Sequence, residues 1–538
     1  MVFQAHGKVK RIGIDLDNTI ICYDMAFQLA AKKFKLVDDV TSLSKESIRN
    51  KIKRRENGEK QWQQIQGYVY GKGINKAHLF PGVYRFLWRC NNRGVIIEIV
   101  SHKTEYGHFD TEKYSLRQAA TQFLLENELL QNREQRNSKQ LISKITFADT
   151  QQDKISYIAD NNFDYFIDDL EEIVQSKHLT NVQSILFNGV NGYSWDEINN
   201  SLLKSWTEQE LLHIVREVMP EKTISLLEKV EGRGNSEINK VVADDNIYIV
   251  KIYPQSGSHN RLLAEYNSLK LLEELSVPYL QIPVAYDQGL GIAIYDYIEG
   301  EKITNYGSAN IKQMLSLLTI LNTHKVRERF VNFNLASNAC LKGSDIEVQI
   351  ENRLKSFDEA LDTHMELKSF INDQFIPAFN DILVWSKNNW PKSYTKNLPN
   401  SDLILSPSDF GFHNMIRTQS GDLFFYDFEY FGWDDPVKLI ADVSHHAAFE
   451  LSVEHERLWL NGCLDIYGQS ILERYRVAWP LYGLVWCLII LNEYNKSLWE
   501  RRIAANGVLK HKKERILLIQ LDKAKKQLSK VLDRYDEI

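Results

Sequence analysis

Two aspartates near the N-terminus have the type and spacing of residues that handle phosphate. Asp15 and Asp17 lie in the run IDLDNT, at the end of a short apolar stretch, Arg11–Leu16, that predicts a strand. Residues two apart on an extended strand point the same way. One carboxylate can then attack a phosphorus atom as a nucleophile, while its neighbour protonates the leaving oxygen.

Further polar residues follow predicted structural elements downstream. Ser101 comes after a second predicted strand, and Asp168 and Asp169 come at the end of a third. Paired carboxylates offer the hard oxygen ligands that Mg²⁺ takes. Ser101 can hold phosphoryl oxygens by hydrogen bonding, and Lys154 can offset their growing charge. Lys144 is an alternative to Lys154 for that role.

In their order along the chain, these residues resemble the four motifs of haloacid-dehalogenase-like phosphatases. The resemblance implies that Asp15 is the nucleophile that becomes an aspartyl-phosphate and that Asp17 is the general acid and base. It implies that Ser101 and Lys154 steady the phosphoryl group. By the same resemblance, Asp15, Asp168 and the backbone carbonyl of Asp17 hold Mg²⁺.

A second set of residues, in the C-terminal half, fits phosphoryl transfer from a nucleotide. Asp409 and Asn414 are five apart in the run SDFGFHN, and Asp427 ends a short predicted strand. Phosphoryl transfer needs a carboxylate near the acceptor hydroxyl and oxygen ligands for Mg²⁺ on the nucleotide. These three residues supply both.

Residues upstream of this set have the chemistry to hold the nucleotide. A glycine-rich turn contains Gly232, Gly234 and Asn235, and its backbone N–H groups can approach phosphates. Lys251 lies in a predicted strand from which it can reach the α- and β-phosphates. Glu265 lies in the next predicted helix, where it is placed to pair with Lys251.

The second set resembles the aminoglycoside phosphotransferase and choline kinase family over about residues 223–521. The resemblance implies that Asp409 is the catalytic base and that Asn414 and Asp427 bind Mg²⁺. One departure is visible, because Pro407 stands two residues before Asp409, where the family commonly has a histidine. That histidine is mainly a structural support, so its loss removes no chemistry.

The same resemblance assigns the nucleotide contacts. Lys251 and Glu265 form the pair that positions ATP, and Tyr295 and Tyr297 lie in the hinge beside the adenine. Glu429 lies where the family keeps acidic residues near its acceptor or its second metal ion.

The N-terminal region, residues 1–192, is expected to be an α/β domain with a doubly wound parallel sheet. Short apolar runs alternate there with amphipathic helices, which is typical of parallel sheets whose ligands bind at the carboxyl ends of the strands. Residues 24–78 interrupt the alternation and predict a small helical cap. The basic run 49–60 is either a solvated helix face or a capture site for substrate phosphate. The expected strands are Arg11–Leu16, Val95–Val100, Tyr165–Ile167 and Ser184–Phe187.

Residues 193–222 are amphipathic and predict a helical linker. Residues 223–538 then predict a two-lobed, protein-kinase-like α+β domain, with a sheet-rich lobe over residues 223–300 and a helical lobe over residues 301–538. The strands of the first lobe are expected at Thr223–Leu227, Lys240–Val242, Ile247–Tyr253, Val284–Gln288 and Ile292–Tyr297.

The bulk composition limits the class of protein. A chain of 538 residues is too long for one core. The net charge of −6 gives no basic surface for general nucleic-acid binding. Five scattered cysteines and no secretory signal at the start predict free thiols in a cytoplasmic protein. The most apolar stretch, Tyr482–Leu491, is too short to span a bilayer and predicts a buried helix rather than membrane insertion.

The leading hypothesis is a bifunctional enzyme that uses Mg²⁺ in both domains and ATP in the second. Its small-molecule partners would be a phosphoester and an acceptor with a hydroxyl or amine. The motifs most resemble proteins of bacterial surface-polysaccharide biosynthesis, which implies a sugar or polyol. The alternatives are a kinase whose phosphatase-like domain only binds or regulates, and a non-enzymatic interaction protein. Oligomeric state is left open.

Overall fold

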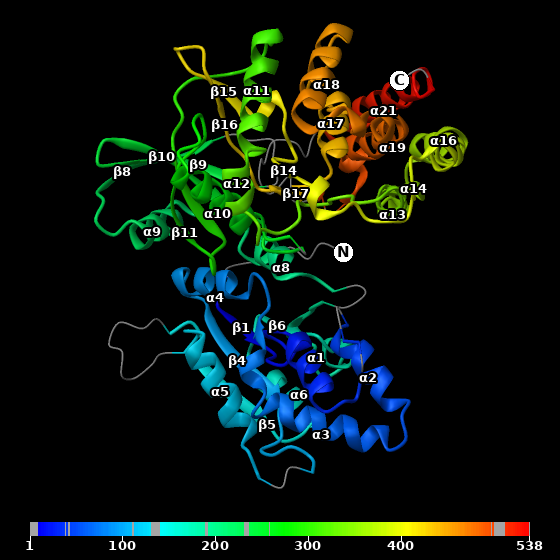
Figure 1. The fold of residues 1–538 in the computed structure, drawn as a ribbon. Coiled ribbons are helices and arrows are strands. Elements are labelled where there is room, and N and C mark those ends of the chain that lie inside the picture. The colour runs from blue at the N-terminus through cyan, green and yellow to red at the C-terminus, as the bar shows by residue number, and fades with distance from the viewer. Residues whose placement is uncertain are drawn as a thin grey trace. The chain divides into compact units, whose positions relative to one another are not determined.

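The computed structural model describes residues 9–37, 39–40, 43–109, 112–130, 140–188, 192–230, 236–257, 259–496, 498–499 and 512–536. They form two compact units, one made mainly of residues 1–214 and the other mainly of residues 215–538 (Figure 1). Each unit has its own sheet and its own hydrophobic core.

The N-terminal unit is built on a parallel sheet of five strands in the order β5-β4-β1-β6-β7, which confirms the predicted parallel sheet. Four strands match the apolar runs of the sequence. The edge strand β5 does not stand out there, because it is only partly buried and mixes Lys144 and Thr146 with apolar residues. The strands are β1 Arg11–Ile14, β4 Ile96–His102, β5 Lys144–Ala148, β6 Tyr165–Asp168 and β7 Gln183–Leu186.

The order of the strands creates a topological switch point. The chain steps from β1 to β4 and β5, then crosses to β6 and β7, so the connections leave β1 and β6 in opposite directions. Because such crossovers are right-handed, α4 and α5 cover one face and α6 and α7 the other. The crevice between the carboxyl ends of β1 and β6 is where such sheets bind ligands. The helices are α4 Val83–Asn92, α5 Leu116–Glu126, α6 Gln151–Asp160 and α7 Glu171–Val174.

A small helical element interrupts the sheet after β1, and residues 24–78 fall within it. Its base is a two-stranded antiparallel ribbon, and its helices pack on one another, with the Phe27 and Trp62 rings stacked at 5.0 Å. Figure 1 shows these helices grouped together in blue. The bounds are β2 Ile21–Cys22, α1 Asp24–Lys33, α2 Lys45–Lys53, α3 Gly58–Tyr70, η1 Ile74–Lys76 and β3 His78–Leu79.

The segment predicted to be a linker contains helices α8 (Trp195–Leu202) and α9 (Glu208–Val218). Trp195 is buried, and its ring contacts Phe86 and Phe187 at 5.1 and 5.4 Å between centroids. Because a buried tryptophan removes a large apolar surface from water, α8 is part of the N-terminal unit rather than a free connector.

The C-terminal unit begins with an antiparallel sheet in the order β11-β12-β10-β9-β8, as the alternating runs of the sequence predict. Helix α10 (Arg261–Glu274) packs against β11 and β12. In the register of the central strands, Lys251 of β10 lies opposite Ala293 of β12. The strands are β8 Ile224–Val230, β9 Glu237–Ala243, β10 Asn246–Ile252, β11 Pro283–Asp287 and β12 Ile292–Asp296.

Five short strands follow in the region predicted to be mainly helical. They form two small antiparallel sheets, β13-β15-β16 and β14-β17, and the loops after β14 and β16 carry Asp409 and Asp427. Strands of two or three residues are too short to show an alternating pattern. The strands are β13 Glu301–Lys302, β14 Ile404–Ser406, β15 Met415–Arg417, β16 Leu423–Phe425 and β17 Gly432–Asp434.

Helices make up most of the rest of this unit and enclose its largest core. Helix α19 contains the buried stretch predicted from the sequence. With its flanks it is long and apolar enough to cross a membrane by length and composition, but 83% of its most apolar window is buried inside the protein, as in a core helix. The helices are α11 Ser308–Leu321, α12 His324–Arg329, α13 Gly343–Lys355, α14 Asp358–Leu361, α15 Met365–Ser369, η2 Phe370–Phe375, α16 Ile376–Asn389, η3 Asn400–Asp402, η4 Phe412–Asn414, α17 Pro436–His445, α18 Val453–Tyr467, η5 Gln469–Ile471, α19 Leu472–Ile490, η6 Leu491–Tyr494 and α21 Lys513–Leu532.

Candidate active sites

The first candidate site lies at the switch point of the parallel sheet. Asp15 directly follows β1, and Asp168 is the last residue of β6. The two strands are neighbours, and the backbone N–H of Asp15 donates to the carbonyl of Ile167 at 2.9 Å. Ser101 lies near the carboxyl end of β4, on the other side of β1, and is buried. The sheet therefore brings three predicted residues to one edge.

Lys154 joins the two aspartates. It comes from the first turn of α6, is 2% exposed, and donates hydrogen bonds of 2.6 Å to Asp15 Oδ1 and to Asp168 Oδ2. Lys144, the alternative weighed from the sequence, is exposed in β5 and donates to the hydroxyl of Tyr157. The geometry therefore places Lys154 at this site.

The carboxylates of this cluster carry more negative charge than Lys154 alone offsets. Burial and the neighbouring charge of Asp168 raise the pKa of Asp15 to about 7, against the opposing effect of Lys154. Burial and the charge of Asp15 raise the pKa of Asp169 to about 6. Oxygen atoms of Asp15, Asp168 and Asp169 all lie within 4.8 Å of one another. This donor set fits a divalent cation with oxygen ligands, which would relieve the repulsion.

Asp17 has partners of its own. Tyr23 donates to its Oδ1 at 2.7 Å, and Lys103 donates to its Oδ2 at 2.6 Å. Burial would raise the pKa of Asp17, but the charge and hydrogen bond of Lys103, together with Tyr23, hold it below its usual value. The sequence alone does not assign a role to Lys103, because its distance from Asp17 along the chain gives no sign that the two side chains meet.

The second candidate site is centred on Lys251, in β10. Its Nζ lies 2.7 Å from Glu265 Oε2, 2.5 Å from Asp427 Oδ1 and 3.2 Å from Glu429 Oε2. Burial opposes the charge of Lys251, but these three carboxylates outweigh that effect and raise its pKa. The predicted Lys251–Glu265 pair is therefore formed. Two further acidic residues, Asp427 and Glu429, also contact Lys251.

The hinge tyrosines differ in position. Tyr295 is fully buried in the core of this unit, and its hydroxyl is 2.7 Å from that of Tyr253, which donates to Glu265 at 2.6 Å. The hydroxyl of Tyr295 therefore supports Glu265 through Tyr253. Tyr297 is 36% exposed. Gly232, Gly234 and Asn235 lie outside the described residues.

Asp409 lies in a tight loop after β14, where Ser408 has a positive φ of 66°. Two histidines contact its carboxylate: His446 Nε2 is 3.1 Å from Oδ1, and His413 Nε2 is 3.3 Å from Oδ2. The side chain of Asn414 donates to the backbone carbonyl of Asp409 at 2.9 Å. Asn414 thus fixes the loop, and its Oδ1 is not used in that bond.

The two histidines hold Asp409 in its charged form. Burial would raise the pKa of Asp409, but hydrogen bonds from His413 and His446 keep it well below its usual value. The pKa of His413 is raised, because Asp409 outweighs the effect of burial. Burial lowers the pKa of His446. The 37-residue separation of Asp409 and His446 in the sequence gives no signal of their contact.

A cluster of three carboxylates provides a candidate cation site beside Lys251. Oxygen atoms of Glu265, Asp427 and Glu429 lie within 4.8 Å of one another. Asp427 has a positive φ of 68°, and burial together with the charges of Glu429 and Glu265 raises its pKa to about 7. Carboxylates crowded in this way fit Mg²⁺ on a nucleotide.

Residues 231–478 match the model of the phosphotransferase enzyme family, APH. The C-terminal unit is therefore similar to this phosphotransferase family over these residues, which supports the kinase part of the sequence prediction. The match does not extend to the N-terminal unit. A search of the curated proteins finds no match to the chain.

Solved structures resemble the C-terminal region at low identity. A putative aminoglycoside phosphotransferase from Ralstonia eutropha is 13% identical, with 61% of this chain and 98% of that one covered and a TM-score of 0.41. Spectinomycin phosphotransferase APH(9)-Ia, in complex with ADP and spectinomycin, is 12% identical, with 59% and 99% covered and a TM-score of 0.41. Choline kinase LicA from Streptococcus pneumoniae is 17% identical, with 60% and 100% covered and a TM-score of 0.38.

Proposed function

We propose that the C-terminal unit is an ATP-dependent kinase for a small molecule. The observation that carries the proposal is the setting of Asp409, a carboxylate kept charged by two histidines. A base in this state can accept the proton of an acceptor hydroxyl. The match of residues 231–478 to a phosphotransferase family supports the same reaction class.

In the proposed reaction the acceptor oxygen attacks the γ-phosphorus of ATP as its proton passes to Asp409. The bond from the γ-phosphorus to the bridging oxygen breaks, and ADP leaves with the electron pair. Lys251, held by Glu265, stabilises the phosphate oxygens. Asn414 and Asp427 would hold Mg²⁺, which when bound offsets the charge of the phosphates.

The acceptor class that we propose is a sugar or polyol with a free hydroxyl, following the resemblance of the motifs. A panel of such metabolites with Mg²⁺ and ATP tests it, scored for ADP. We expect one class of acceptor to stimulate ADP release, and Asp409→Asn to abolish the stimulation. Binding of Mg²⁺–ATP in calorimetry without turnover on any acceptor would contradict the kinase proposal and favour a protein that only binds nucleotide.

We propose for the N-terminal unit a phosphatase reaction through an aspartyl-phosphate. The Asp15–Lys154–Asp168 cluster supports it, because it combines a nucleophile, a fixed cation and metal ligands at a ligand-binding strand edge. Asp15 attacks phosphorus, the ester bond breaks, and Asp17 passes a proton from the Lys103 ammonium, which donates to it, to the leaving oxygen. Water then attacks the aspartyl-phosphate and gives its proton to Asp17, which releases phosphate and restores Asp15.

In this reaction Asp15, Asp168 and Asp169 would hold Mg²⁺, which when bound draws charge from the phosphoryl oxygens. Hydrolysis of p-nitrophenyl phosphate with Mg²⁺ tests the reaction. Lys154→Met should lower kcat by about 100-fold or more, the size of effect of losing a fixed group that stabilises developing charge. The matched control Lys144→Met should leave it unchanged. Absence of hydrolysis by the wild-type protein would favour the alternative, a domain that binds or regulates without turnover.

A further inference from the structure

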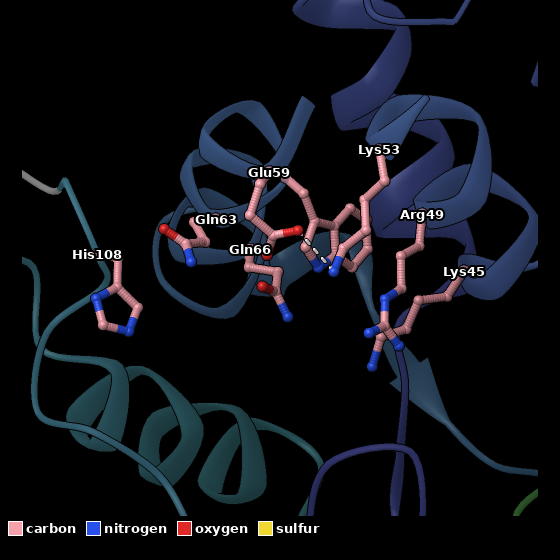
Figure 2. Close-up of a pocket in the computed structure, with 8 residues that line it drawn as sticks. Lys45, Arg49, Lys53, Glu59, Gln63, Gln66 and His108 are labelled. Carbon is pink, nitrogen blue, oxygen red and sulfur yellow. Dashed lines mark ion pairs between the residues drawn. The ribbon is translucent and has the colours of Figure 1, made fainter. Parts of the chain in front are cut away.

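A polar pocket with a volume of about 300 Å³ lies in the helical insertion of the N-terminal unit. Figure 2 shows Lys45, Arg49 and Lys53 along one side and His108 across from them. Gln63 and Gln66, from α3, also line it. Glu59 and Trp62 complete the lining, so three lysine and arginine side chains face a single carboxylate, and a lining with this excess of positive charge suits an anion.

The cations are arranged by the helix that carries them. Lys45, Arg49 and Lys53 are four residues apart on α2, so their side chains lie on one face, while Ile48 and Ile52 are buried. Like charges at this spacing repel and destabilise a helix. Glu59 pairs with Lys53 at 2.8 Å. Among the described residues, neither Lys45 nor Arg49 has a carboxylate within ion-pair distance, so the pocket keeps an excess of positive charge.

A chain of contacts links the pocket to the first candidate site. The ammonium of Lys45 lies 5.5 Å from the centre of the Tyr70 ring, and that of Lys103 lies 4.7 Å from the same ring. Lys103 donates to Asp17. Tyr70 therefore stands between the basic pocket and the acid–base residue. The positive charge of Lys45 also lowers the pKa of Asp17, after the larger effects of burial and Lys103.

We propose that the pocket binds a second anionic group of the phosphatase substrate, carried by the leaving group. A phosphoester with its reacting phosphoryl group at Asp15 and its leaving group beside Asp17 places the rest of the molecule toward Lys45. A second phosphate or a carboxylate there meets Arg49 and Lys53, with Gln63, Gln66 and His108 as hydrogen-bond donors. The inference rests on the proposed phosphatase and narrows its substrates to phosphoesters that carry a second anionic group.

The test compares substrates in two matched pairs: glucose 1-phosphate with glucose 1,6-bisphosphate, and glycerol 3-phosphate with 3-phosphoglycerate. The first pair adds a phosphate and the second a carboxylate. The pair whose two KM values differ more therefore shows which of these anionic groups the pocket prefers. We expect a lower KM for the member with two anionic groups in at least one pair. R49Q combined with K53Q should raise that KM about tenfold, which is about 1.4 kcal/mol of binding, and should leave the KM of the partner with one anionic group unchanged.

The matched control is Lys51→Gln, which removes an exposed charge from the same helix outside the pocket. Equal KM values within both pairs, or an R49Q/K53Q variant that matches K51Q, would overturn the inference and leave the phosphatase standing. Calorimetry with glucose 1,6-bisphosphate and Asp15→Asn gives a readout without turnover. If no ester is hydrolysed, the phosphatase proposal fails, and tighter binding to D15N than to D15N/R49Q/K53Q still decides whether the pocket holds the anion.

Discussion

His446 presents one defined tautomer to Asp409. Its Nδ1 accepts a hydrogen bond from the backbone N–H of Ala448 at 3.1 Å, so the ring proton of the neutral form is on Nε2, which faces Asp409. Burial lowers the pKa of His446 and favours that neutral form. The ring is also stacked on Phe449 at 4.9 Å. His446 therefore orients the carboxylate, a support that Pro407 cannot give at its position in the sequence.

We expect His446→Ala to lower kcat of the kinase by about 10- to 100-fold, because a small misplacement of a reacting group has effects of this size. KM for ATP should stay unchanged, since the Lys251–Glu265 pair does not touch His446. Steady-state kinetics separates the two constants. His446→Gln should restore part of kcat through its amide N–H, and His324→Ala, at an exposed histidine, should have no effect. An equal loss in His446→Gln and His446→Ala would argue against orientation by a donated hydrogen bond.

At the scale of single residues, the sequence predicts several residues that the structure gathers at the two candidate sites, but not all of their partners. Asp15, Lys154 and Asp409 are recognisable because their types and order suit phosphate chemistry. Lys103 and His446 are not, because each meets its aspartate only through the fold, at separations of 86 and 37 residues. Tyr295 is predicted to lie in the hinge, and nothing in the sequence shows that its side chain is fully buried.

Among the elements, strands with continuous apolar runs are predicted well, because burial on both faces leaves a direct mark on the sequence. The edge strand β5 and the short strand β14 leave no such mark, although β14 positions Asp409, whereas a short strand before Asp427 is predicted and corresponds to β16. The packing of α8, in the segment predicted to be a linker, could not be predicted for another reason. Its amphipathic pattern shows that a face is buried but not which partner buries it.

The packing of α9 against α4 depends on a buried ion pair. Glu210 is 2% exposed and contacts Arg89 at 3.1 Å and Arg93 at 2.7 Å. Burial would raise the pKa of Glu210, but these arginines lower it to about 2, from an ordinary 4.5. A carboxyl whose pKa is depressed in the folded state stabilises the fold above its unfolded pKa. This contribution is therefore present above about pH 4.5 and is lost as the pH falls toward 2.

Glu210→Gln should destabilise the N-terminal unit at pH 7 by about 3–5 kcal/mol, because it leaves the fully buried Arg89 without its counter-charge. Urea unfolding at pH 7 and at pH 4 measures this. The difference between wild type and variant should shrink at the lower pH, because Glu210 takes up a proton in the unfolded state there while it stays ionised in the folded state. Glu208→Gln, at an exposed position in the first turn of the same helix, is the control and should change little at either pH.

For the whole molecule, the decisive feature is that the described residues of each candidate site come from one compact unit. Asp15, Lys154 and Asp168 all lie in the N-terminal unit, and Lys251 and Asp409 lie in the C-terminal unit. Each set contains its own reacting carboxylate and its own fixed cation. Opposed action on one ester would only consume ATP, so we infer that the two sites act on different positions or on different molecules.

This separation predicts reciprocal variants of the full chain. Asp15→Asn should abolish phosphate release from p-nitrophenyl phosphate and leave acceptor-dependent ADP formation unchanged. Asp409→Asn should do the reverse, because neither substitution alters a group within the other unit. Both activities are measured on the same preparations, so a loss of folding would show in the activity that is expected to persist. Loss of both activities in either variant, with an unchanged unfolding profile, would mean that the sites are coupled and that one reaction depends on the other.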